Sequence, residues 1–107
     1  MNNLSEKVSS FLENKKVENV KIINLEGKSP FFDFIIIGSL NNSRALDSIA
    51  DETNSFLESL GLVTKIPEGN GESGWVLLDA GDFVIHLLSE EKRNELSLEE
   101  VIEKSFH

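Results

Sequence analysis

Apolar residues cluster most densely near the end of the chain, in two strand-length runs at residues 75–78 and 83–88. Ala80 and Gly81 lie between the runs, and Gly81 can adopt the positive φ that a tight turn requires. Two such runs around a short glycine-containing turn predict a β-hairpin. A two-residue turn would pair Asp79 with Asp82 and Trp75 with His86.

Side chains alternate along a strand, and directly paired residues share a face. One face of the predicted hairpin is therefore uniformly apolar and belongs to the core: Val76, Leu78, Phe83, Ile85 and Leu87. The opposite face is only half apolar, and we expect it to be the functional surface: Trp75, Leu77, Val84 and His86, with Asp79 and Asp82 at its end.

The rest of the pattern predicts one order of elements, α-β-β-α-β-β-β-α. Helical spacing predicts helices that start near Leu4 and at Ser43, the latter capped by Asn42 or Ser43, and a short charged helix over residues 89–96 with one further turn. Further strands are predicted at residues 20–25, 31–37 and 62–66, the last ending at Pro67. Three glycines in residues 68–74 predict a mobile surface loop.

This order predicts a single α/β (α+β) domain over residues 1–107, with a five-stranded mixed sheet and helices mainly on one face. Two amphipathic helices cover about one face of such a sheet. Apolar residues on the uncovered face typically mark an interaction site. The face that carries Trp75 is therefore the candidate docking surface.

Charge narrows the class of partner, because 10 basic and 19 acidic residues give a net charge of −9. Such a chain repels phosphate backbones, so we expect no direct nucleic-acid binding and attraction to a basic protein surface. The chain has no cysteine and no apolar stretch near the roughly 20 residues that span a bilayer, which predicts a cytoplasmic protein without a membrane partner.

The candidate catalytic and metal-binding patterns are weak. Asp79, Asp82 and His86 do not form a metal site, because His86 lies about four residue steps from the turn, on the order of 13 Å. Gly38-Ser39, after an apolar strand, is placed like the phosphate-binding pair of nucleotidyltransferases, but no Asp-x-Asp pair follows on the next strand. We therefore expect no cofactor and no enzyme, with a residual nucleotide-binding or nucleotide-transferring activity as the alternative.

The chain resembles the ribosomal silencing factor family (RsfS, also called Iojap) from about Leu4 to Glu99. The most specific stretch is Trp75-Val-Leu-Leu-Asp79-x-Gly81-Asp82-x-Val84-x-His86, with Glu68-Gly69 seven residues before the tryptophan. Further matches are Gly27-Lys28-Ser29, Asp33, Ser43-Arg44 and Ser48-Ile49-Ala50-Asp51. The departures are local: Ser39-Leu40-Asn41-Asn42 replaces Thr-Gly-Thr-Ser, Ala45 a histidine, Leu96 a tyrosine and Ile102 a tryptophan.

The resemblance implies a nucleotidyltransferase-like fold without catalysis. It also implies binding to the large ribosomal subunit at its basic fourteenth protein, which blocks joining of the small subunit and lowers translation when nutrients fall, and a homodimer in many members. On this basis we expect the partner-binding residues to be Glu68, Trp75, Leu77, Asp79, Asp82, Val84 and His86.

Overall fold

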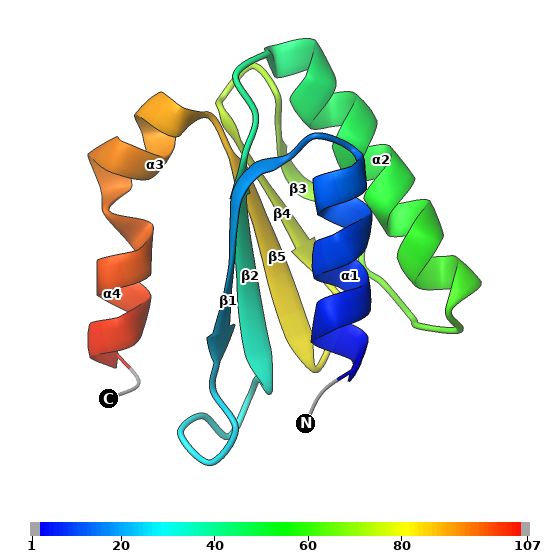
Figure 1. The fold of residues 1–107 in the computed structure, drawn as a ribbon, viewed down its shortest axis with the longest axis vertical. Helices are drawn as coiled ribbons and strands as arrows, with labels where there is room; N and C mark the ends of the chain where they lie inside the picture. Colours follow the sequence, from blue (N-terminus) through cyan, green and yellow to red (C-terminus); the bar gives the residue numbers. More distant parts are fainter. Residues whose placement is uncertain (1–2, 106–107) are drawn as a thin grey trace.

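The computed structural model describes residues 3–105, which form four helices and one five-stranded sheet (Figure 1). The elements are α1 (Asn3–Asn14), β1 (Glu18–Asn24), β2 (Phe34–Ser39), α2 (Ser43–Ser59), β3 (Glu68–Asn70), β4 (Trp75–Asp79), β5 (Phe83–Leu88), α3 (Glu90–Leu96) and α4 (Leu98–Ser105). None of the helices among these residues is long and apolar enough to cross a membrane.

The sheet has the strand order β1-β2-β5-β4-β3. β2 and β5 pair in parallel at its centre, and the other three pairs are antiparallel. The predicted mixed, five-stranded α+β fold is therefore confirmed. All six residues of β2 are buried, as expected of a central strand covered on both faces.

The main core lies between the sheet and the helices α1 and α2, which lie together on one side of the sheet (Figure 1). α2 is capped by Asn42, whose Oδ1 accepts a hydrogen bond from the backbone N–H of Ala45 at 2.9 Å. Its buried residues recur at helical spacing and are apolar except for a threonine: Leu46, Ala50, Thr53 and Leu57. This face of the sheet is closed.

The opposite face is less open than the sequence predicts, because the C-terminal helices pack on it. Ile102 of α4 is buried in a second apolar cluster with side chains of β1, β2 and β5. Arg93 of α3 is 8% exposed, and its guanidinium donates to Ser39 Oγ at 2.9 Å and to Glu99 Oε1 at 2.8 Å. These bonds join α3 to β2 and to α4, so the two helices cover part of this face.

The edge strand lies elsewhere than predicted. Residues 62–66 form no strand; one backbone bond, from the Lys65 N–H to the Asp79 carbonyl at 3.1 Å, joins them to β4, and the Lys65 ammonium also pairs with the Asp79 carboxylate at 3.5 Å. Pro67 cannot donate to a ladder, so regular pairing starts only at Glu68. The strand that completes the five-stranded sheet at this edge is therefore β3, which lies inside the predicted loop of residues 68–74.

The remainder of that loop is fastened to its surroundings. The backbone N–H of Gly71 donates to Asp47 Oδ1 in α2 at 2.7 Å, and the Gly74 carbonyl accepts from the N–H of Ser89 at 2.9 Å. A Cβ on Gly71 would collide with the Ser43 carbonyl, so this close approach requires glycine. The predicted surface loop of residues 68–74 therefore contains a short strand at residues 68–70.

The predicted hairpin is confirmed, but its register differs by two residues: Leu77 pairs with His86, Asp79 with Val84 and Trp75 with Leu88. The cause is a wider turn, in which Asp79 Oδ1 accepts from the N–H of Gly81 at 2.9 Å and leaves Asp82 outside the strand. A shift of two keeps each strand side chain on its predicted face.

Candidate protein-docking face

The sheet face turned away from α1 and α2 carries a row of paired residues across four strands. Glu68 of β3 pairs with Leu77 of β4, Leu77 with His86 of β5, and His86 with Ile37 of β2. Trp75 lies two pairs further along β4, opposite Asn70 and on the same face as Leu77. We name the part beyond the C-terminal helices the Trp75 face: Glu68, Trp75, Leu77, Asp79 and His86.

Trp75 and His86 form the centre of this face. The indole Nε1–H donates to His86 Nδ1 at 3.0 Å, and the ring centroids are 5.8 Å apart with a 36° tilt. An accepting Nδ1 places the imidazole proton on Nε2. Burial lowers the pKa of His86 to about 4, so the ring is neutral at pH 7. The bond fixes the indole edge toward the sheet.

Trp75 and Leu77 are both partly exposed, whereas Val84 is only 4% exposed and belongs to the second apolar cluster. Val84 is therefore not exposed on this face, and its role in partner binding stays a prediction. Its position in the row between Asp79 and Ile35 makes it a support beneath the face.

The three carboxylates expected at the rim have different surroundings. Asp79 is already paired, with Lys65 Nζ at 3.5 Å and with the Gly81 N–H. Asp82 is exposed in the turn, where its carbonyl accepts from the N–H of Asp33 at 2.7 Å. Glu68 is exposed and makes no ion pair or side-chain hydrogen bond with any residue in the range 3–105. Among the described residues, Glu68 is thus an unpaired acid directly opposite Leu77 across β3 and β4.

A pocket of about 330 Å³ opens beside Trp75. It lies between the β3–β4 edge and α3 and is lined by Glu68, Gly69, Ser73, Trp75, Leu77 and Lys92. Lys92 and Ser73 are not among the residues predicted from the sequence. Lys92 lies within a run of charged residues in α3, and nothing in such a run indicates which side chain reaches the face.

Two nearly fully exposed apolar residues at the sheet edge also lie outside the prediction: Val63 is 89% exposed and Ile66 is 88% exposed. Both come from the extended segment beside Asp79. The sequence pattern assigned this segment to a strand, and an apolar residue in a predicted strand is normally expected in the core. They enlarge the apolar surface available at this side of the molecule.

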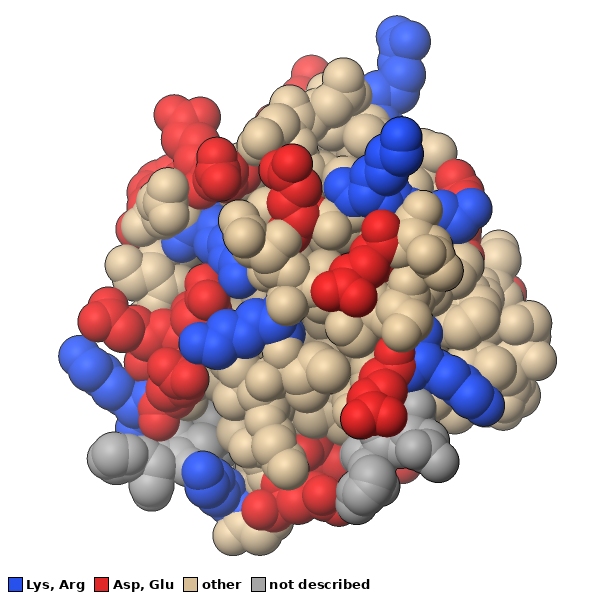
Figure 2. Space-filling view, viewed as in Figure 1, with Lys and Arg blue, Asp and Glu red and all other residues tan. Residues whose placement is uncertain are grey.

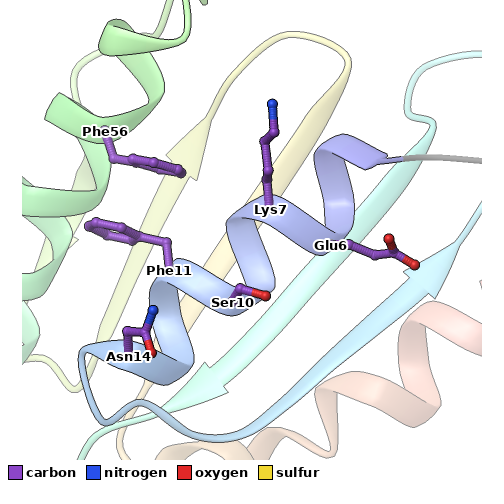
Figure 3. Close-up of a pocket in the computed structure, with 6 residues that line it drawn as sticks. All are labelled: Glu6, Lys7, Ser10, Phe11, Asn14 and Phe56. Atoms are coloured by element: carbon purple, nitrogen blue, oxygen red, sulfur yellow. The ribbon is translucent and has the colours of Figure 1, made fainter.

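A larger hollow, of about 530 Å³, lies on the opposite side, along α1 (Figure 3). There Phe11 and Phe56 stack with centroids 4.2 Å apart, and outside the hollow Lys15 pairs with Glu52 at 2.7 Å. Figure 3 shows the two rings facing each other while Lys7 and Glu6 point away from them. Charges of both signs are interspersed on this side of the molecule (Figure 2). Because Phe11 and Phe56 already stack on each other, the hollow along α1 offers no aromatic ring that lacks a partner. We therefore favour the Trp75 face as the functional surface.

The Gly38-Ser39 pair does not form a phosphate cradle in this conformation. Ser39 is 0% exposed, and its hydroxyl accepts from Arg93. A Cβ at Gly38 would collide with Val17, so the glycine permits close packing against the segment before β1. No group of three or more His, Cys, Asp or Glu side chains suited to a metal ion is found within residues 3–105.

Comparison with known proteins identifies the relatives of this chain. A family model described as "Ribosomal silencing factor during starvation" matches residues 1–105. The chain is 37% identical over 93 residues to a protein of Zymomonas mobilis and 32% identical over 90 residues to one of Halalkalibacterium halodurans, both named ribosomal silencing factor RsfS. The matches cover 86% and 84% of this chain and 69% and 77% of the two relatives.

Solved structures agree with this result. A crystal structure of a Bacillus halodurans protein, 30% identical, superimposes with a TM-score of 0.79 over 94% of both chains. A Chromobacterium violaceum protein has the same fold with a TM-score of 0.84 at 23% identity, over 92% of this chain and 82% of its own. The resemblance inferred from the sequence is thereby confirmed, and the chain belongs to the ribosomal silencing factor family.

Proposed function

We propose that this protein binds the large ribosomal subunit at its basic fourteenth protein and thereby sterically blocks joining of the small subunit. The consequence is repression of translation under nutrient limitation, in the cytoplasm. Membership of the ribosomal silencing factor family supports the ribosome as the target of binding. The observation that carries the site is the partly exposed Trp75–Leu77 pair beside the unpaired carboxylate of Glu68. An aromatic anchor with an acidic rim suits a basic protein partner.

The residues take different roles in this proposal. Trp75 and Leu77 form the desolvated centre of the contact, and Glu68 and Asp82 meet lysine or arginine at its rim. His86 orients the indole from within the sheet, and Asp79 shapes the turn. Charged pairs at such a rim chiefly set specificity and the rate of association.

A net charge of −9 also favours this kind of partner. Ribosomal RNA repels the chain, so direct contact with RNA contributes little, whereas a basic ribosomal protein attracts it. The interaction requires no cofactor.

Co-sedimentation with isolated large subunits tests the proposal. We expect the protein to pellet with large subunits, to stay in the supernatant with small subunits, and to reduce the yield of joined ribosomes. Failure to pellet with large subunits at low salt would overturn the proposal. Pelleting without an effect on joining would overturn the steric block alone.

The alternative of a nucleotide-binding enzyme requires an accessible Gly38-Ser39. Calorimetric titration with ATP and CTP in the presence of Mg²⁺ separates the two functions. We expect no heat of binding, since Arg93 and the packed helices enclose Ser39. Saturable heat that is lost in a Ser39→Val variant would favour the enzyme.

We also infer that the protein forms a homodimer, as the family resemblance implies. The exposed Val63 and Ile66, in the segment that Lys65 joins to Asp79, supply apolar surface for self-association. A dimer that uses this surface competes with the ribosome for it. Sedimentation velocity of the protein alone and with large subunits tests this competition, and a dimer that stays intact on the subunit would exclude it.

A further inference from the structure

The pocket beside Trp75 has a chemistry that specifies one kind of guest. We propose that it is a socket for a single arginine side chain of the basic partner, seated on the Trp75 ring with its guanidinium at Glu68. This inference rests on the proposed function, because it names the partner residue that the Trp75 face receives.

The floor of the pocket is apolar and has a fixed orientation. Trp75 and Leu77 line it, and the indole N–H is already used by His86 Nδ1 at 3.0 Å. The indole therefore has no donor left for a polar guest and offers the face of its ring. A flat guanidinium stacks on such a face more readily than an ammonium group does.

The acidic group of the pocket is Glu68. Its carboxylate has no ion pair among residues 3–105, in contrast to Asp79, which Lys65 neutralises. Glu68 pairs with Leu77 across β3 and β4, so it lies on the same face as the pocket floor. A carboxylate beside an aromatic floor matches the fork of an arginine, which bonds carboxylates in a bidentate manner.

Lys92 is the basic group of the pocket, and its charge determines how the affinity for a charged guest should change when the group is removed. Lys92 enters from α3 and lies 3.6 Å from Glu95, an exposed partner that neutralises it only in part. Its ammonium opposes a cationic guest, and an acidic guest would instead be drawn to it. Removal of Lys92 and removal of Glu68 must therefore change guest affinity in opposite directions.

The test uses the full chain and the fluorescence of Trp75, the only tryptophan in the sequence. Acetylated, amidated Gly-Arg-Gly, Gly-Lys-Gly and Gly-Glu-Gly are titrated at low salt. We expect a saturable change with the arginine peptide at millimolar concentration and a weaker one with lysine. Glu68→Gln should weaken arginine binding about two- to five-fold, and Lys92→Gln should tighten it by a similar factor, the range for exposed ion pairs. Glu13→Gln, which removes the same charge from α1 on the other side of the sheet, should leave it unchanged.

Tighter binding of the glutamate peptide than of the arginine peptide, strengthened by Glu68→Gln and weakened by Lys92→Gln, would overturn the proposal in favour of an acidic guest. An arginine response that neither variant alters would show that no socket exists. Large subunits report on the proposed function separately. A chain that pellets with them while arginine fails to bind retains that function without the socket, and the reverse result retains the socket alone.

Discussion

Trp75 and His86 are joined by a side-chain hydrogen bond although they are not directly paired across β4 and β5. Trp75 faces Leu88 and His86 faces Leu77, so the 3.0 Å bond runs diagonally over the face. A diagonal neighbour is within reach of an aromatic side chain. The bond uses the one polar atom of the indole and leaves the ring as the exposed part of the residue.

Replacing Trp75 by alanine should weaken binding to large subunits by about 2 kcal/mol or more, roughly 30-fold, as expected of a central aromatic anchor. The measurement is co-sedimentation over a range of subunit concentrations, with circular dichroism to confirm that the variant is folded. Val101→Ala removes a partly exposed apolar side chain from α4, away from the Trp75 face, and serves as the control. Equal affinity of the folded Trp75→Ala variant and the wild type would remove the tryptophan from the contact.

Acid should destabilise the protein through His86. Its folded pKa of about 4 lies below the ordinary value of 6.5, so the unfolded state binds more protons between these values. The free energy of unfolding therefore falls as the pH drops from 6.5 toward 4, by at most about 2 kcal/mol between pH 7 and pH 5. Urea unfolding at the two pH values measures it.

A His86→Gln variant provides the comparison, since its amide can still accept the indole N–H but does not titrate in this range. The lowered pKa of Glu99, caused chiefly by its hydrogen bond with Arg93, also makes acid destabilising, but at lower pH. The wild type should lose more stability than the variant between pH 7 and pH 5. Equal losses of unfolding free energy in the wild type and in His86→Gln would show that His86 is not the group responsible.

Arg93→Ala should lower the free energy of unfolding by about 2–4 kcal/mol, because it leaves the buried Ser39 hydroxyl without its donor and Glu99 with the more distant Lys21, at 3.9 Å. Hydrogen exchange should rise in α4 before it rises in α2. Lys92→Ala changes the neighbouring, more exposed cation and should cost less than about 0.5 kcal/mol. A loss of similar size in both variants would contradict a special role for the buried guanidinium.

Gly71→Ala should be more damaging than Gly27→Ala, for a steric reason. A Cβ at Gly71 would collide with the Ser43 carbonyl, whereas a Cβ at Gly27 meets nothing within 4 Å and disfavours only the φ of +79°. We expect Gly27→Ala to cost about 1 kcal/mol and Gly71→Ala clearly more, since the loop must move off α2. Thermal unfolding of both variants measures the difference, and the reverse order would refute this account of the loop.

Alternation of apolar residues was sufficient to predict both faces of the β4–β5 hairpin. Its register depended on the Asp79 side chain, which bonds the N–H of Gly81, and an apolar pattern contains no information about such a bond. The two-residue shift preserved the faces but moved Asp82 out of the strand. The apolar pattern therefore predicted which hairpin residues lie in the core, but it did not predict the positions of Asp79 and Asp82 at the end of the other face.

At the edge of the sheet, the apolar pattern predicted the wrong strand. β3 consists of Glu68, Gly69 and Asn70, which have low strand propensity and are held by backbone pairing with β4. Val63 and Ile66 have high propensity but lie exposed outside the ladder. Glu68 was identified from the family motif, and its unpaired state and the proximity of Lys92 required coordinates.

The parallel pairing of β2 with β5 joins two parts of the sheet that are each built from neighbouring segments. β1 and β2 can associate early during synthesis, but the centre of the sheet stays incomplete until Leu88 has been added. Arg93 and Ile102, which close the other side, follow later still. A nascent chain therefore lacks a finished Trp75 face until β5 has been added, so the proposed docking surface must form late and in a single step as the chain is elongated.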